Sequence, residues 1–86
     1  MVERSAKVKN KLGIHARPAA YLVQAASKFS AKITFVKDGL EVNGKSIMGV
    51  MMLAAEEGSE IDIRAVGNDA DEAVAKLLDM IENEFD

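Results

Sequence analysis

The strongest constraint on the fold is a hairpin signal in the middle of the chain. Residues 32–37 alternate so that Ile33 and Phe35 share one face of a strand. Asp38-Gly39 follows directly, and glycine readily adopts the positive φ that a tight β-turn needs. A short return strand, Leu40-Glu41-Val42, then ends at a second turn pair. The pattern predicts two antiparallel strands joined by Asp38-Gly39.

The periodicity of the apolar residues predicts two further strands and three helices. Alternation over residues 2–9 and over 60–66 indicates strands. Apolar spacings of three and four predict helices over 16–28 and 70–81. The run over 46–53 favours a shorter helix, although a buried strand would carry much the same pattern. The order β-α-β-β-α-β-α predicts an α+β fold, a two-layer open-faced sandwich whose four-stranded, mainly antiparallel sheet is covered on one face by three helices.

Three residues predict where the helices begin. Pro18, the only proline, is tolerated only in the first turn of a helix, so the first helix starts just before it. The Ser46 hydroxyl is expected to cap the middle helix. Asp69, followed three residues later by Glu72, predicts a capping box at the start of the last helix.

Composition limits the number of domains and the available chemistry. Eighty-six residues, 49% of them hydrophobic, predict a single domain over residues 1–86. A formal net charge of −3 argues against a general nucleic-acid binder, and the absence of cysteine excludes disulfides, thiolate zinc sites and a cysteine nucleophile. One histidine and no clustered ligand pattern predict no metal and no cofactor. With no signal peptide and no apolar run of bilayer length, we expect a cytoplasmic protein without membrane contact.

The single histidine, His15, has neighbours suited to phosphate chemistry. It lies at or just before the predicted helix start, where unpaired backbone N–H groups and the helix dipole favour an anion. Arg17 adds a cation with several donors for phosphate oxygens. A neutral imidazole is a competent nucleophile near pH 7. Composition alone favours a surface histidine without a role; its neighbours favour a site for a transient phosphoryl group.

Two segments resemble the HPr family, the histidine-containing phosphocarriers of the bacterial sugar phosphotransferase system. The segment KLGIHARPA, residues 11–19, is similar to the family's active-centre motif. The segment VNGKSIMGVM, residues 42–51, is similar to its regulatory-serine segment and closer to the Gram-positive form than to the enteric one. The element order and the length agree with the family over essentially the whole chain.

The resemblance implies a carrier that is not an enzyme on its own. Enzyme I, phosphorylated by phosphoenolpyruvate, would pass its phosphoryl group to Nδ1 of His15, and the group would then move to sugar-specific IIA domains. Arg17 would steady the phosphate charge, and the backbone amides of Ala16 and Arg17 would donate to phosphate oxygens. Transfer between histidines would need no Mg²⁺.

The resemblance also implies regulation at Ser46. The HPr kinase/phosphorylase would phosphorylate this hydroxyl, and a phosphoserine is electrostatically compatible with a helix N-terminus. Its charge would oppose acidic enzyme I and could create a site for a catabolite-control transcription regulator.

The middle helix is too short to bury every side chain, so we expect one of its faces to bind partner proteins. A lone methionine is more often core filler, but three of them lie between residues 47 and 53. We expect inward packing of Val50 and Leu53, an exposed patch of Ile47, Met48 and Met51 near His15, and a basic rim that includes Lys28, Lys45 and Arg17.

Other functions remain open beside the sugar-system carrier. The carrier of the nitrogen-related phosphotransferase branch shares the histidine chemistry, although the serine segment argues against it. A non-catalytic regulatory binding module would keep the fold, whereas a paralogue lacking the active histidine is excluded by His15. A small phosphohydrolase would need a general acid or a metal that the sequence does not place near the histidine. A relay role favours a monomer.

Overall fold

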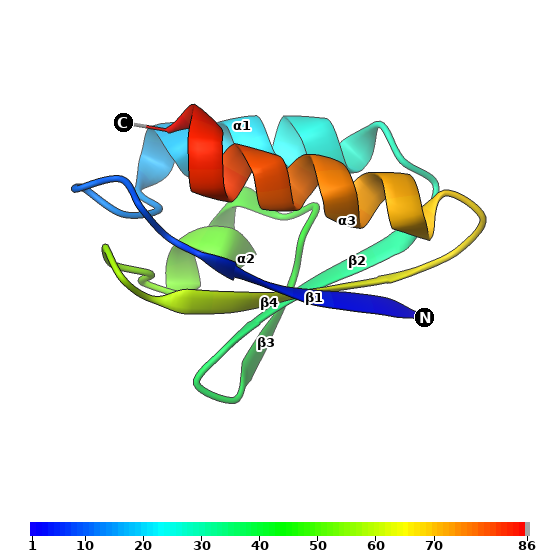
Figure 1. Cartoon of the computed structure of the whole chain (residues 1–86), viewed down its shortest axis with the longest axis horizontal. Coiled ribbons are helices and arrows are strands. Elements are labelled where there is room, and N and C mark those ends of the chain that lie inside the picture. The colour runs from blue at the N-terminus through cyan, green and yellow to red at the C-terminus, as the bar shows by residue number, and fades with distance from the viewer. Residues whose placement is uncertain (86) are drawn as a thin grey trace.

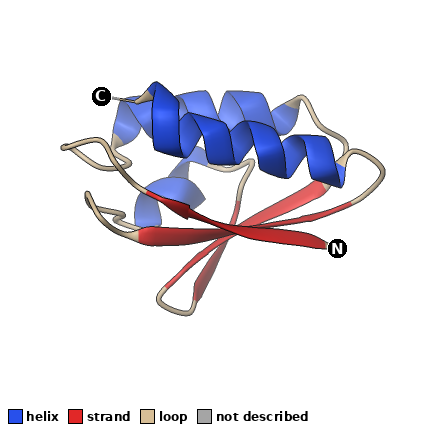
Figure 2. Cartoon of the chain, viewed as in Figure 1, coloured by secondary structure: helices blue, strands red, loops and turns tan. Residues whose placement is uncertain are grey.

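The computed structural model describes residues 1–85 and has two layers, a sheet and a set of helices (Figure 1 and Figure 2). The order β-α-β-β-α-β-α is as predicted. Within these residues, none of the helices has the length and apolarity needed to cross a membrane. The elements are β1 (Val2–Lys7), α1 (Ala16–Ser27), β2 (Lys32–Lys37), β3 (Leu40–Asn43), α2 (Ile47–Met52), β4 (Glu60–Val66), α3 (Ala70–Asp79) and a terminal π-helical turn, η1 (Met80–Glu84).

All neighbouring strands of the sheet are antiparallel, in the order β1-β4-β2-β3. The predicted hairpin joins β2 to β3, and Asp38 and Gly39 both have positive φ, 52° and 82°, as a tight two-residue turn of this hand requires. β1 lies at one edge and pairs with β4 so that Val2 is opposite Ala65. These observations confirm the predicted fold class.

The core lies between the sheet and the helices that cover one of its faces (Figure 1). Alternate residues of the strands point into it and meet the apolar stripes of α1 and α3, as the periodicity predicts. Burial of one such leucine or isoleucine contributes about 1.5–3 kcal/mol. The largest fully buried side chains are Val8, Leu22, Ile33, Phe35, Val50, Ile61, Ile63, Val74, Leu77 and Ile81.

The predicted capping box at the start of α3 is wrong. Asp69 occupies the cap position, but its side chain makes no capping hydrogen bond. Its carboxylate instead accepts hydrogen bonds from the backbone N–H groups of Ser30 and Ala31, each at 2.8 Å. The bond from Ser30 is the main reason that the pKa of Asp69 lies below its ordinary value. The carboxylate therefore joins the start of α3 to the connection between α1 and β2.

The end of the chain lies close to the start of α1. After α3, the turn η1 keeps Met80 and Ile81 buried and places Phe85 beside the first turns of α1. Figure 1 shows the C-terminal end of the ribbon next to the loop that leads into α1. Segments from both ends of the chain therefore contribute to one surface.

Candidate functional site

The loop before α1 is held in place by backbone contacts. Gly13 has a φ of +71°, and a Cβ there would overlap the carbonyl oxygen of Ala55 and lie 3.0 Å from Cα of Glu56. The N–H of Ile14 donates to that same Ala55 oxygen at 2.9 Å. Only glycine combines this backbone conformation with so close an approach. The contacts fix the chain two residues before His15.

Asn10 supports the same loop from inside. Its side chain is 3% exposed, and Nδ2 donates to the carbonyl of Gly13 at 2.6 Å. The N–H of Gly13 donates back to the carbonyl of Asn10 at 3.1 Å. These reciprocal bonds close the turn that delivers the chain to α1. Sequence reasoning gave Asn10 no role.

His15 lies at the N-cap of α1, as predicted. Its backbone is extended, and its carbonyl accepts the first helical bond, from the N–H of Ala19 at 2.9 Å. The imidazole makes no capping hydrogen bond and is exposed. The first amides of a helix have no intrahelical partner; here they belong to Ala16 and Arg17. No acidic residue lies in the first turn, so the positive end of the helix dipole is available to an anion.

A hollow of about 310 Å³ brings His15 and Arg17 together. Both side chains are exposed, and within residues 1–85 Arg17 makes no ion pair. Pro18 closes part of the floor from the first turn of α1. The remaining lining comes from residues to which sequence reasoning gave no role: Leu12, Tyr21, Glu84 and Phe85.

One of these missed residues carried a detectable signal. Tyr21 follows Arg17 by four positions, a spacing that places both on the same face of a helix. Glu84 and Phe85 carried none, because only the tertiary fold brings the C-terminal turn to α1. Phe85 is half-buried and lines the hollow.

α2 begins at Ile47 with Ser46 as its N-cap, which confirms the helical interpretation of this segment. Oγ of Ser46 accepts a hydrogen bond from the N–H of Gly49 at 3.1 Å. Val50 and Leu53 are buried, as expected. The exposed apolar side chains of α2, which we call the α2 patch, are Ile47, Met48, Met51 and Met52.

The α2 patch is continuous with the histidine site. A second hollow, of about 290 Å³, is lined by His15, Met51 and Leu12 among others. His15 therefore lies between two hollows, one toward the C-terminal turn and one toward α2. The expected proximity of Met51 and His15 is confirmed.

The basic rim differs from the expectation at Lys45. Its Nζ donates to the carbonyl of Phe29 at 2.7 Å, so this ammonium group binds the end of α1. Lys28 and Arg17 are exposed. Within residues 1–85, no three histidine, aspartate or glutamate side chains gather as metal ligands.

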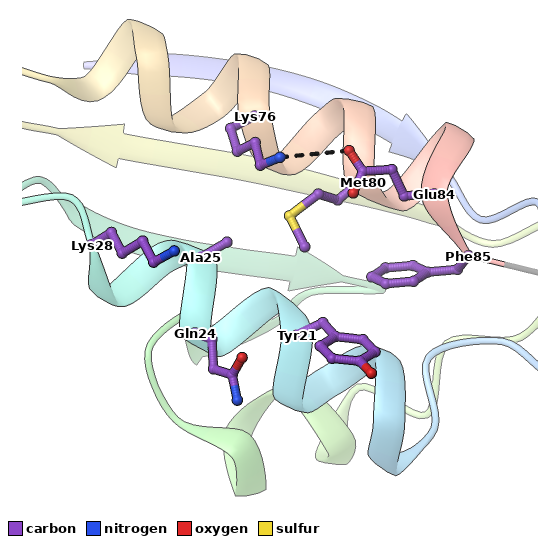
Figure 3. A pocket seen from close by; sticks show the side chains of 8 residues that line it. All are labelled: Tyr21, Gln24, Ala25, Lys28, Lys76, Met80, Glu84 and Phe85. Carbon is purple, nitrogen blue, oxygen red and sulfur yellow. Dashed lines mark ion pairs between the residues drawn. The ribbon is translucent and has the colours of Figure 1, made fainter.

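A larger groove, of about 400 Å³, runs between α1 and the C-terminal turn (Figure 3). Figure 3 shows Tyr21 and Phe85 at one end, Lys28 at the other, and the side chain of Met80 between them. Glu84 pairs with Lys76 at 3.5 Å across one wall. The groove is lined by no histidine, whereas the smaller hollow beside it holds His15 and Arg17, the residues that the sequence predicts for a phosphoryl site.

The chain is similar over nearly its whole length to known phosphocarrier proteins. The family model described as the PTS HPr component phosphorylation site matches residues 2–83. The phosphocarrier protein HPr of Treponema pallidum is 46% identical over 86 residues, which cover 100% of this chain and 98% of that relative. The HPr-like protein Crh of Halalkalibacterium halodurans is 50% identical over 84 residues, covering 98% of this chain and 100% of that relative.

Solved structures agree with these relatives. HPr-C-His from Thermoanaerobacter tengcongensis has a TM-score of 0.94 and 49% identity, covering 99% of this chain and 96% of that chain. An HPr dimer from the same organism has a TM-score of 0.78 and 49% identity, covering 100% of this chain and 99% of that chain. Fold and site therefore define a phosphocarrier of the bacterial phosphotransferase system, a class that carries a group without being a catalytic enzyme. The chain belongs to the HPr family.

Proposed function

We propose that the chain accepts a phosphoryl group from phospho-enzyme I on His15 and donates it to sugar-specific IIA domains. The observation that carries the proposal is the exposed imidazole of His15 at the N-cap of α1, beside two free amides and Arg17, with no acidic residue in the first turn. An anionic group attached to this imidazole lies where amides, dipole and guanidinium all favour negative charge.

The chemistry is an exchange of one P–N bond for another. The lone pair of Nδ1 of His15 attacks phosphorus on the donor histidine of enzyme I, the donor P–N bond breaks, and its electron pair returns to the donor imidazole. In a second transfer of the same kind, the acceptor of a IIA domain attacks the phosphorus on His15, the P–N bond to Nδ1 breaks, and its electron pair returns to the imidazole of His15. Arg17 and the amides of Ala16 and Arg17 stabilise the phosphoryl oxygens during transfer. Because the site is open to solvent, the bound state is not over-stabilised and onward transfer stays fast.

Intact-mass measurement with enzyme I and phosphoenolpyruvate tests the carrier function. We expect one acid-labile phosphoryl adduct, and none on His15→Ala, which removes the nucleophile from an exposed position and leaves the thermal transition nearly unchanged. An adduct of normal yield on His15→Ala would refute the assignment of the nucleophile. Failure of the wild-type protein with active enzyme I would refute the carrier function in the sugar system.

Partner docking is proposed for the α2 patch. Met48 projects from α2 into solvent, so Met48→Asp should weaken transfer from enzyme I by raising KM while the thermal transition stays in place. Val66→Asp is the control, because Val66 is also an exposed apolar residue, 54% exposed, and lies on β4 outside the patch. Equal KM values for wild type and Met48→Asp would remove α2 from the docking surface.

Regulation at Ser46 rests on its cap position. A phosphoryl group on Oγ would stay at the positive end of α2 and add negative charge beside the α2 patch. Phosphorylation by an HPr kinase/phosphorylase would then reduce docking of enzyme I and provide a site for a catabolite-control regulator. Ser46→Asp should accept the phosphoryl group more slowly than wild type, and unchanged kinetics would remove this regulatory role.

Two alternatives are separated by the same assay. A carrier of the nitrogen-related branch would accept the group from that branch's enzyme I in preference to the sugar-system enzyme. A regulatory module would accept it from neither; this alternative is favoured by the similarity to Crh of Bacillus subtilis, a protein described with catabolite repression. We further propose that the protein is cytoplasmic and monomeric. Light scattering of the purified protein tests the monomeric state, and the solved HPr dimer makes this measurement necessary.

A further inference from the structure

Apart from Met1, which is 80% exposed at the start of the sequence, the methionines of this chain fall into two groups. Met48, Met52 and Met51 are 72%, 64% and 40% exposed, whereas Met80 is 6% exposed in the core. The three exposed residues follow one another at spacings of three and one on the six-residue helix α2. Met51 and Met52 lie three and four positions after Met48, spacings that place each of them beside Met48 on the surface of α2.

We propose that Met48, Met51 and Met52 form an oxidation site whose sulfoxides block docking of partner proteins on α2. The effect on partner docking rests on the proposed function. The site of oxidation does not, because it is argued from the exposure of the three methionines. The chain contains no cysteine, so no thiol competes with these thioethers for a peroxide.

The reaction is a transfer of one oxygen atom. A sulfur lone pair attacks one oxygen of hydrogen peroxide, so that an S–O bond forms as the O–O bond breaks. The proton on the attacked oxygen passes to the departing hydroxide, and the products are a methionine sulfoxide and water. The sulfur loses two electrons and the peroxide gains them. Methionine sulfoxide reductases reverse the change, so the modification can act as a switch.

Oxidation changes the α2 patch without removing the helix. The sulfoxide adds a polar oxygen to a side chain that docking would bury, and an unpaired polar group resists burial. Met51 shares a hollow with His15, so the change reaches the edge of the phosphate site. The helix itself is held by buried Val50 and by the Ser46 cap, neither of which contains sulfur.

Peptide mapping after graded treatment with hydrogen peroxide tests the site before any partner is added. Within the α2 patch and the core, we expect Met48 and Met52 to oxidise first, Met51 next and Met80 last, because exposure sets access. Met1, which lies outside α2 and is 80% exposed, should react as readily as Met48. Oxidation of Met80 at the same rate as Met48 would overturn the proposed site. This arm does not depend on the phosphocarrier function.

The effect of oxidation on partner docking is tested by phosphoryl transfer from enzyme I after the peroxide has been removed. Oxidised protein should show about a 10-fold fall in kcat/KM for phosphoryl acceptance, and a sulfoxide reductase should restore it. The control variant replaces Met48, Met51 and Met52 with leucine, which stays apolar and cannot form a sulfoxide. It retains Met1 and Met80, and its reference is its own activity before treatment. Peroxide should leave kcat/KM of this variant at that reference value, whatever the value is relative to wild type.

The experiment distinguishes failure of the oxidation inference from failure of the carrier function. Untreated protein that accepts normally, together with fully oxidised protein that accepts at the same rate, overturns the inference and leaves the carrier function intact. Equal loss of activity in the leucine variant would also overturn it, because the damage would then lie outside α2. Untreated protein that does not accept at all contradicts the carrier function, and with it the claim that oxidation controls docking.

Discussion

Replacing Gly13 with alanine should damage both the stability and the site, by an amount that a matched variant can isolate. Gly13 and Gly39 have similar positive φ values, +71° and +82°. A Cβ at Gly13 would lie 3.0 Å from Cα of Glu56 and overlap the Ala55 carbonyl, whereas a Cβ at Gly39 would meet nothing within 4 Å. The two variants therefore share the backbone strain and differ in the steric overlap.

The expected losses in the free energy of unfolding follow from the backbone strain and the steric overlap. The left-handed conformation costs alanine about 1–2 kcal/mol, offset by about 0.4–1 kcal/mol because the unfolded chain loses freedom. Overlap in a packed region adds about 1–3 kcal/mol. Gly39→Ala should therefore lower the free energy of unfolding by roughly 1 kcal/mol and Gly13→Ala by about 2–4 kcal/mol.

Urea denaturation measures both values, and each kcal/mol also lowers Tm by about 4–8 °C in a domain of this size. Phosphoryl acceptance should fall in Gly13→Ala, since the overlap displaces the bond between Ile14 and Ala55 that fixes the loop before His15. It should be unchanged in Gly39→Ala. Equal losses of stability in the two variants would refute the steric argument.

Three further predictions concern single side chains. Ser46→Ala removes the cap of α2 and should cost about 1 kcal/mol in thermal unfolding, whereas Ser46→Asn should retain most of it. Asn10→Ala leaves the buried Gly13 carbonyl without its 2.6 Å partner; a loss of about 1–3 kcal/mol in urea is expected, and no loss would remove Asn10 from the loop support. Because the pKa of Asp69 is lowered on folding, its carboxylate stabilises the protein fully above its unfolded pKa and less as the pH falls through the folded pKa. The difference in Tm between wild type and Asp69→Asn should shrink below about pH 4, and a difference independent of pH would contradict this origin.

Local signals in the sequence predicted the parts of the fold that depend on neighbouring residues. The turn at Asp38-Gly39 and the cap at Ser46 were predictable because each depends on a few consecutive residues. Asp69 was assigned to the wrong partner for a physical reason. A local cap and a distant pair of amides both satisfy an aspartate, and only the packing of the Ser30–Ala31 segment against the start of α3 decides between them.

The candidate site also contains residues that the local sequence predicts and residues that only the tertiary fold brings together. His15, Arg17 and the start of α1 are adjacent in sequence, so their chemistry was accessible from the pattern. The face of α2 that remains exposed was predictable too, because a helix of six residues cannot bury every side. Glu84 and Phe85 join the hollow only through the path of the C-terminal turn, and no nearby residue indicates that path.

The edge position of β1 has a consequence during synthesis. β1 leaves the ribosome before β4, its partner in the sheet, which lies about 60 residues later along the chain. At roughly 5–20 residues per second, β1 waits about 3–12 s without a neighbour. Its exposed positions include Glu3, Arg4 and Lys7, and charges on an unpaired strand discourage pairing with other nascent chains. The same residues that face water in the folded sheet thus protect the strand before the sheet exists.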